Sequence, residues 1–131
     1  MEGSLRELAG YRMERANEML EAAKKNLEIN QYKTSLNRSY YAIFHAMRAA
    51  NILKGFDSSK HSGVIAYFNR EYLKSGILEK SLSVIIKNSA FLREKSDYDD
   101  FFIASRKDAE KQLEDANAFV MVIEQFLKCN L

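Results

Sequence analysis

The stretch LNRSYYAIFHAMRAA, residues 36–50, carries two patterns at once. Its apolar members recur at alternating spacings of four and three, the repeat of one face of an α-helix; they are Leu36, Tyr40, Ile43, Met47 and Ala50. A second row recurs at three, four and three, and it consists of Arg38, Tyr41, His45 and Arg48. At about 100° per residue, Arg38 lies about 200° from Leu36 around the helix. The polar row therefore faces away from the apolar row.

The same helical spacing continues on both sides of this stretch. Apolar stripes spaced by four and three predict a first helix across residues 9–27 and a last helix across residues 109–127. A shorter helix is predicted at about residues 60–74, and a fourth is marked by apolar residues at 78–92. The polar segment REKSDYDDFF, residues 93–102, is expected to form a turn-rich connection.

Local signals set the expected helix ends. Gly55 and Gly76 each follow an apolar stripe and predict a helix terminus. Two pairs have the spacing of a capping box, namely Ser4 with Glu7 and Ser105 with Asp108. No strand pattern competes, and the sequence predicts an all-α fold, an antiparallel up-and-down four-helix bundle with one additional short helix. Residues 1–131 are expected to form a single domain.

Composition narrows the function classes. The chain has 131 residues, 47% of them hydrophobic, so it can bury a core without disulfides or metals. No apolar run approaches the ~18 residues of a membrane span, and the N-terminus lacks the pattern of a signal peptide. The single cysteine, Cys129, cannot form an internal disulfide, which favours a cytoplasmic location. A net charge of +2 argues for contact with RNA or nucleotides at a local site, rather than through a strongly basic surface.

The polar row offers a specific chemistry. Arg38 and His45 are seven residues apart, so their Cα atoms are separated by about 10.5 Å and both could reach one phosphodiester. Arginine donates a planar fork of hydrogen bonds to phosphate oxygens. A neutral histidine can take a proton from a ribose 2′-hydroxyl, which permits metal-free RNA cleavage. The alternative is that the row is an ordinary solvated face of a surface helix.

Three short segments of the chain resemble motifs of a known family, and they are RSYYAIFH (residues 38–45), KHSG (residues 60–63) and YDDF (residues 98–101). With the helical pattern around them, nearly the whole chain resembles the HEPN family (higher eukaryotes and prokaryotes nucleotide-binding), in particular its short stand-alone prokaryotic members. The resemblance implies a four-helix up-and-down bundle with a short extra helix. The family signature, an arginine followed four to six residues on by a histidine, maps onto Arg38 and His45 with six residues between them.

The resemblance also implies an activity and partners. Active members of the family are metal-independent endoribonucleases, commonly homodimers with both Arg/His pairs in a shared cleft. Many are toxins that a partner of the minimal nucleotidyltransferase type neutralises. Other members have lost catalysis and serve as binding modules. The toxin-type motif usually has a polar residue, often asparagine, directly after the arginine, whereas this chain has Ser39 there and Asn37 before it, a mild departure.

On this interpretation, Arg38 binds the scissile phosphate and His45 is the general acid or base. The residues expected to shape the cleft and bind substrate are Asn37, Ser39, Tyr41 and Arg48. A dimer would supply a second His45, so that acid and base are both present. His61 is the other imidazole in the chain, although a capping or packing role is favoured for it, and Tyr98 is expected to face the cleft with Tyr41.

No cofactor and no metal are expected. Asp97, Asp99 and Asp100 could hold Mg²⁺, but an acidic turn paired with Arg93 and Lys95 is favoured. The first hypothesis is thus a metal-independent HEPN ribonuclease, the toxin of a toxin–antitoxin pair. The alternatives are a non-catalytic nucleotide- or substrate-binding module that partners a minimal nucleotidyltransferase, and a plain interaction bundle with no effect on RNA.

Overall fold

Helix α2 is the element on which the rest of the chain packs. The computed structural model describes residues 2–130, and α2 (Tyr32–Leu53) contacts α1, α3, α4 and α5 within them. The other elements are α1 (Glu2–Glu28), α3 (His61–Phe68), a π-helical continuation of α3 called η1 (Asn69–Lys74), α4 (Leu82–Tyr98) and α5 (Arg106–Cys129). The described residues contain no strand. The prediction of an all-α bundle with one short additional helix is confirmed.

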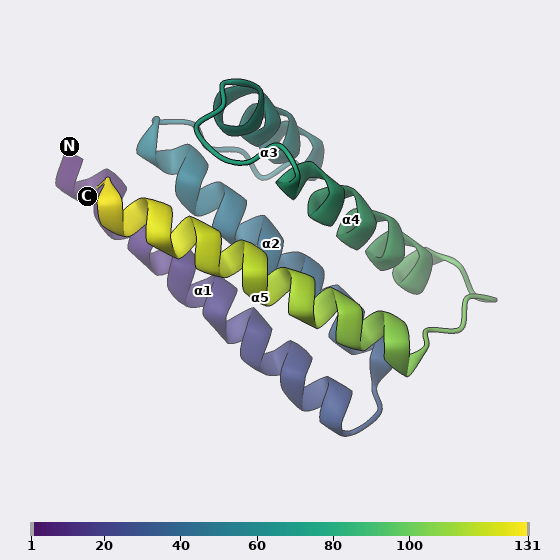
Figure 1. Cartoon of the computed structure of the whole chain (residues 1–131). Helices are drawn as coiled ribbons and strands as arrows, with labels where there is room; N and C mark the ends of the chain where they lie inside the picture. The colour runs from purple at the N-terminus through teal and green to yellow at the C-terminus, as the bar shows by residue number, and fades with distance from the viewer. Residues whose placement is uncertain (1, 131) are drawn as a thin grey trace.

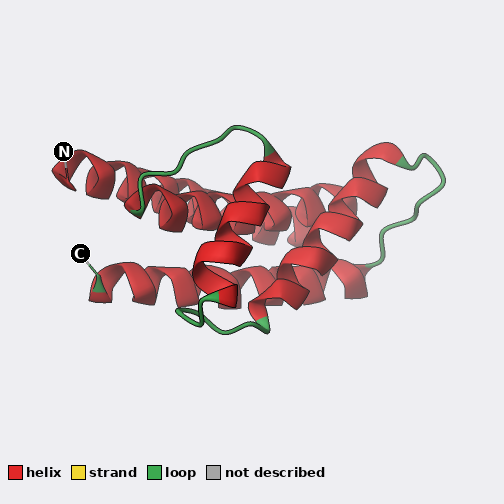
Figure 2. Ribbon diagram, turned by 90° about the horizontal axis from the view of Figure 1, so that it is seen from above, coloured by secondary structure: helices red, strands yellow, loops and turns green. Residues whose placement is uncertain are grey.

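The long helices alternate in direction. Figure 1 shows α1, α2 and α5 side by side, with the first residues of α1 and the last residues of α5 at the same end. The contact of Asn37 with Asp97, and of Tyr41 with Arg93, means that α2 and α4 run antiparallel. Seen from above in Figure 2, α3 and α4 cross in front of the longer helices. Through this arrangement α4 packs on both α2 and α5.

Small side chains let the central helices approach closely. The alanines of α2 are fully buried, as are two in α1, and they are Ala42, Ala46, Ala49, Ala50, Ala16 and Ala23. Because an alanine methyl adds little bulk, the helix backbones can lie close together. Larger side chains from the surrounding helices fill the remaining core, among them Phe68, Tyr72, Phe119 and Ile123.

Most of the predicted helix ends are found. Gly55 and Gly76 follow their helices with φ of 82° and 83°, a left-handed conformation that glycine adopts without strain. The Ser105 hydroxyl caps α5 by accepting a hydrogen bond of 3.0 Å from the backbone N–H of Asp108. The capping box at Ser4 is wrong, because α1 already begins at Glu2 and Ser4 lies within its first turn.

The predicted turn at residues 93–102 is wrong in its first half. Helix α4 continues to Tyr98, and only the residues after it leave the helix. Ion pairs at i,i+4 spacing stabilise these last turns, with Arg93 3.0 Å from Asp97 and Lys95 3.7 Å from Asp99. The polar composition of this segment thus belongs to a solvent-facing helix end. Within the described part of the chain, no helix is long and apolar enough to span a bilayer.

The packing makes a direct prediction for α5. Phe119 is fully buried, with its ring 5.7 Å from that of Phe68, whereas Met121 on the same helix is 69% exposed. Phe119→Ala should lower the free energy of unfolding by about 3–5 kcal/mol, because it removes buried contacts and leaves a cavity. Met121→Ala should change it by less than about 0.5 kcal/mol. Urea denaturation measures both, and equal effects would contradict the packing.

Candidate functional site

The polar row of α2, together with Asn37 next to Arg38, lies half-buried among residues from other elements. Its side chains are neither in the core nor fully in solvent, and they are Asn37, Arg38, Tyr41, His45 and Arg48. Helix α4 contacts the row at its N-terminal end. At the C-terminal end, Asp57 in the loop after α2 binds Arg48 of the row and also Arg12 of α1. The row therefore has two differently partnered ends, one centred on Arg38 and one on His45.

Arg38 is held by its sequence neighbour and, through it, by α4. Its Nη1 donates a hydrogen bond of 2.6 Å to the side-chain oxygen of Asn37. The amide nitrogen of Asn37 in turn donates to Asp97 over 3.1 Å. The same Asp97 carboxylate is 3.0 Å from Nε of Arg93. Asn37 thus belongs to the site, but as a link between Arg38 and α4.

Arg93 is surrounded by tyrosine rings. Its guanidinium carbon lies 5.4 Å, 5.6 Å and 5.5 Å from the ring centres of Tyr40, Tyr41 and Tyr98. It also donates to the Tyr41 hydroxyl over 3.3 Å. Since cation–π contacts hold a guanidinium against ring faces, Arg93 is fixed in place. Tyr41 and Tyr98 share this cation, so the structure brings the two predicted tyrosines to the same end of the site.

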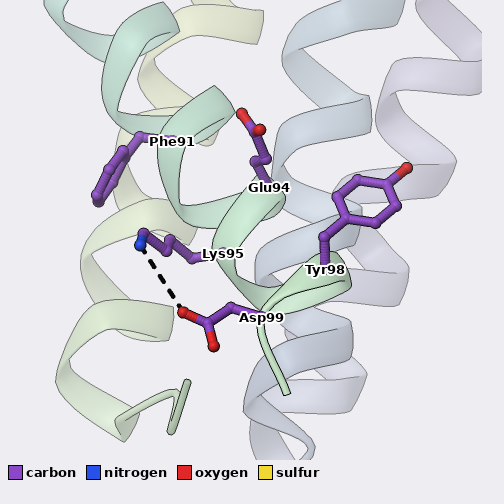
Figure 3. A pocket seen from close by; sticks show the side chains of 5 residues that line it. All are labelled: Phe91, Glu94, Lys95, Tyr98 and Asp99. Atoms are coloured by element: carbon purple, nitrogen blue, oxygen red, sulfur yellow. Dashed lines mark ion pairs between the residues drawn. The ribbon is translucent and has the colours of Figure 1, made fainter. Parts of the chain in front are cut away.

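The outer face of α4 carries a shallow hollow next to Tyr98. Figure 3 shows its lining, which consists of Phe91, Glu94, Lys95, Tyr98 and Asp99. Lys95 and Asp99 form the ion pair drawn there, and Asp99 also accepts a hydrogen bond from the backbone N–H of Phe101. Asp97 and Asp99 are thus paired with protein donors. In residues 2–130, no group of three or more His, Cys, Asp or Glu side chains is arranged to hold a metal ion.

His45 lies at the other end of the row, in a positive environment. Burial lowers the pKa of His45 to about 4, and the charges of Arg15, Arg48 and Arg12 add to this effect. The imidazole is therefore neutral at pH 7. Arg15 and Arg12 come from α1, so α1 brings two cations to a histidine of α2.

A single carboxylate in the loop after α2 holds two of these arginines. Asp57 binds Arg12 through two hydrogen bonds of 2.9 Å and 3.0 Å, and it accepts a third from Arg48 at 2.8 Å. Arg12 is only 8% exposed. These hydrogen bonds lower the pKa of the Asp57 carboxyl to about 2. Asp57 thus fixes the positions of Arg12 and Arg48 beside His45.

His61 packs within an aromatic cluster next to the row. Its Nδ1 is 2.9 Å from the Tyr40 hydroxyl, and its ring centre is 4.3 Å from that of Phe44. Tyr41 lies between the two histidines, with ring centres 6.2 Å from His45 and 5.6 Å from His61. Burial, and then the charge of Arg93, lower the pKa of His61. These contacts describe a packed imidazole at the edge of the site.

Ser39 does not lie with the other predicted residues. It is fully buried, so its hydroxyl faces the core and is not available to a ligand. The reason is its position, three residues after Leu36 and four before Ile43, which places it on the apolar face of α2. The expectation that Ser39 shapes the cleft therefore disagrees with its burial.

Five charged residues lie around the row that the sequence did not identify as its neighbours. They are Arg12, Arg15, Asp57, Arg93 and Asp97. One signal was present for Arg12. It lies three residues after Ala9 and four before Ala16, so it is a charged residue at the edge of an apolar stripe. Because Arg12 is largely buried, its charge needs a partner, and the partly exposed carboxylate of Asp57 provides one.

Comparisons with known proteins identify the family. The HEPN domain family model matches residues 9–126, and the chain belongs to the HEPN domain family. A UPF0332 protein of Thermotoga maritima is 33% identical, over 90% of this chain and 89% of its own. The protein named Putative toxin MJ0605, from Methanocaldococcus jannaschii, is 36% identical over 88% of this chain and 86% of its own. The crystal structure of TT1696 from Thermus thermophilus has the same fold, with a TM-score of 0.75, 19% identity, and coverage of 89% of this chain and 96% of that one.

The environment of His45 predicts its titration. By NMR, the imidazole of His45 should titrate with a midpoint near pH 4, and Arg15→Gln should raise its pKa because one repelling charge is removed. Since the folded-state pKa lies below the unfolded value, the free energy of unfolding should fall as the pH drops from about 6.5 to about 4. A midpoint near 6.5 in the wild-type protein would contradict the buried, cationic environment.

The double ion pair of Asp57 predicts a stability effect. Because its pKa is lowered from 3.8 to about 2, the charged carboxylate stabilises the fold above pH 3.8, and this contribution is lost as the pH falls through 2. Asp57→Ala should therefore lower the free energy of unfolding at pH 7 by about 1–2 kcal/mol, a value discounted because the side chain is 44% exposed. The difference from wild type should be smaller at pH 3. Asp100→Ala is the control, and an Asp57 effect no larger than the control would contradict the assignment.

Proposed function

We propose that this protein is a metal-independent endoribonuclease and the toxin component of a toxin–antitoxin pair. The observation that supports this most strongly is a neutral imidazole, His45, flanked by arginines along one face of α2. The family and the name of the Methanocaldococcus jannaschii relative support the toxin role. The neutralising partner would be a minimal nucleotidyltransferase.

The proposed reaction is an internal transfer at phosphorus. His45 accepts the proton of a ribose 2′-hydroxyl, and the 2′-oxygen attacks the adjacent phosphorus. The bond from phosphorus to the 5′-oxygen breaks, leaving a 2′,3′-cyclic phosphate and a 5′-oxygen that takes up a proton. Arg38 donates hydrogen bonds to the phosphate as its charge increases. The guanidinium groups thus stabilise the negative charge on the phosphate, a role that a metal ion has in metal-dependent nucleases.

The low pKa of His45 is compatible with a role as base. In the free protein, burial and then the charges of the nearby arginines keep the imidazole unprotonated and ready to accept a proton. A bound phosphate brings negative charge next to those arginines, which offsets their share in lowering the pKa of His45. Substrate binding therefore makes His45 a stronger base when the base is needed.

A homodimer would complete the chemistry. Departure of the 5′-oxygen requires a proton donor in addition to the base. His61 is packed against Phe44 and bonded to the Tyr40 hydroxyl, which makes it a poor proton carrier. The donor would then be His45 of the partner subunit, brought across a two-fold axis into a shared cleft, and it can donate only once the bound phosphate has raised its pKa enough for it to be protonated.

The second candidate is a non-catalytic module that binds RNA or a nucleotide. The specific observation in its favour is the same histidine, because an imidazole with a pKa of about 4 carries little of the protonated form near pH 7. Phosphate binding by the arginines requires no proton transfer. In that case the protein would present its ligand to a nucleotidyltransferase partner.

Cleavage of RNA in EDTA tests the proposal. Wild type should produce fragments ending in 2′,3′-cyclic phosphate, and His45→Ala should lower the rate by about 100-fold or more because the base is lost. Arg38→Ala should have a similar effect through the phosphate. Lys33→Ala, an exposed change on the same helix, is the matched control and should leave the rate unchanged.

Two outcomes would contradict the proposal. Equal cleavage by wild type and His45→Ala would show that the activity belongs to another site or another protein. Absence of cleavage by wild type, with RNA binding that depends on Arg38, would support the binding module instead.

A further inference from the structure

A line of polar contacts joins α4 to the phosphate-binding residue of α2. Nε of Arg93 is 3.0 Å from the Asp97 carboxylate, the Asn37 amide donates to that carboxylate over 3.1 Å, and Nη1 of Arg38 donates to the Asn37 oxygen over 2.6 Å. Arg38 and Asn37 are both half-buried. The line therefore ends at the guanidinium that the proposed reaction uses.

Asn37, in the middle of this line, can bond to both of its neighbours in only one orientation of its amide. A carboxylate only accepts hydrogen bonds and a guanidinium only donates them. Asn37 lies between the two, and its amide has a donor for Asp97 and an acceptor for Arg38. Asp97 thus determines which way the amide points, and the amide determines where an acceptor for Arg38 is located.

The far end of the line is packed against neighbouring side chains. The Arg93 side chain is 19% exposed and that of Asp97 is 26% exposed. Arg93 is held against three tyrosine rings and by the Tyr41 hydroxyl. An arginine on a helix surface otherwise samples many rotamers, and ordering it only when substrate binds would cost entropy.

We propose that Asp97 is a positioning residue, which acts through Asn37 to hold the Arg38 guanidinium in its phosphate-binding orientation, with Arg93 as the anchor. The inference rests on the proposed function, since it concerns the orientation of Arg38 toward a scissile phosphate. Asp97 itself does not touch the substrate. Its contribution is to the organisation of the site before binding.

The kinetic test compares single variants of Asp97 and Asn37 with a double variant that exchanges the two residues and keeps the total charge. Asp97→Ala should lower kcat about 10-fold with KM little changed, because Arg38 is left unoriented while other arginines still bind the RNA. Asn37→Asp should also lower kcat, because two carboxylates then face each other. The double variant Asn37→Asp/Asp97→Asn restores a donor opposite an acceptor at every step and should recover most of the loss.

Two matched variants separate positioning from general damage. Asp99→Ala removes a carboxylate two residues away that is paired with Lys95, and it should leave kcat unchanged. In an Arg38→Ala background, Asp97→Ala should have no further effect, because the residue that it positions is gone. An equal additional loss in that background, or no recovery in the exchange variant, would overturn the proposal.

A spectroscopic measurement keeps this test independent of catalysis. In the ¹H–¹⁵N NMR spectrum, the side-chain N–H groups of Arg38 should be restrained in the wild-type protein, mobile in Asp97→Ala and restrained again in the exchange variant. Arg38 signals that are the same in wild type and Asp97→Ala would overturn the proposal. If wild type cleaves no RNA while the Arg38 signals respond as expected, the ribonuclease assignment fails and the positioning of Arg38 by Asp97 stands.

Discussion

The burial of α2 is the constraint on which the rest of the structure depends. Its apolar face and its alanines are covered by α1, α3, α4 and α5, so between residues 36 and 50 only the polar row and Asn37 beside it remain near the surface. That row lies at the junction of the covering helices, where α1 and α4 both reach it. A polar residue in such a place must find partners, because it is partly removed from water. The site is thus a consequence of how the bundle closes around α2.

The two ends of the row meet this requirement in different ways. At one end, Arg38 is held through neutral and acidic partners that leave its own charge available. At the other end, Asp57 neutralises part of the charge of Arg12 and Arg48, while His45 stays neutral among them. The result is a surface with cationic donors on both sides of an uncharged imidazole. This is the arrangement that an RNA phosphate and its neighbouring 2′-hydroxyl would fit.

The fold and one face of the site could be predicted from the sequence because both depend on local periodicity. Spacing alone placed Arg38, Tyr41, His45 and Arg48 on one face, and glycines marked the helix ends at 55 and 76. Spacing also held the information on Ser39, which falls on the apolar face and is buried. Reading that residue through a family motif led away from what the periodicity indicated.

The remaining parts of the site could not be predicted, because they depend on contacts between distant segments. Arg12 and Asp57 are 45 residues apart, and Asn37 and Asp97 are 60 apart. Nothing in a helical repeat says which residue of α4 will lie opposite a given residue of α2. The prediction of a turn at residues 93–98 was also wrong. The polar composition of this segment favours a turn, but ion pairs at i,i+4 spacing keep it helical.

The central claim is that the polar face of α2 is where this protein holds a phosphodiester. The most direct measurement is a ¹H–¹⁵N NMR titration with a short single-stranded oligonucleotide in which the 2′-hydroxyls are replaced by hydrogen, so that it binds without being cleaved. The account predicts chemical-shift changes at residues 37–48 of α2, at Arg12 and Arg15 of α1, and at Arg93 and Asp97 of α4. Changes confined to the outer face of α5, or no changes at all, would contradict it.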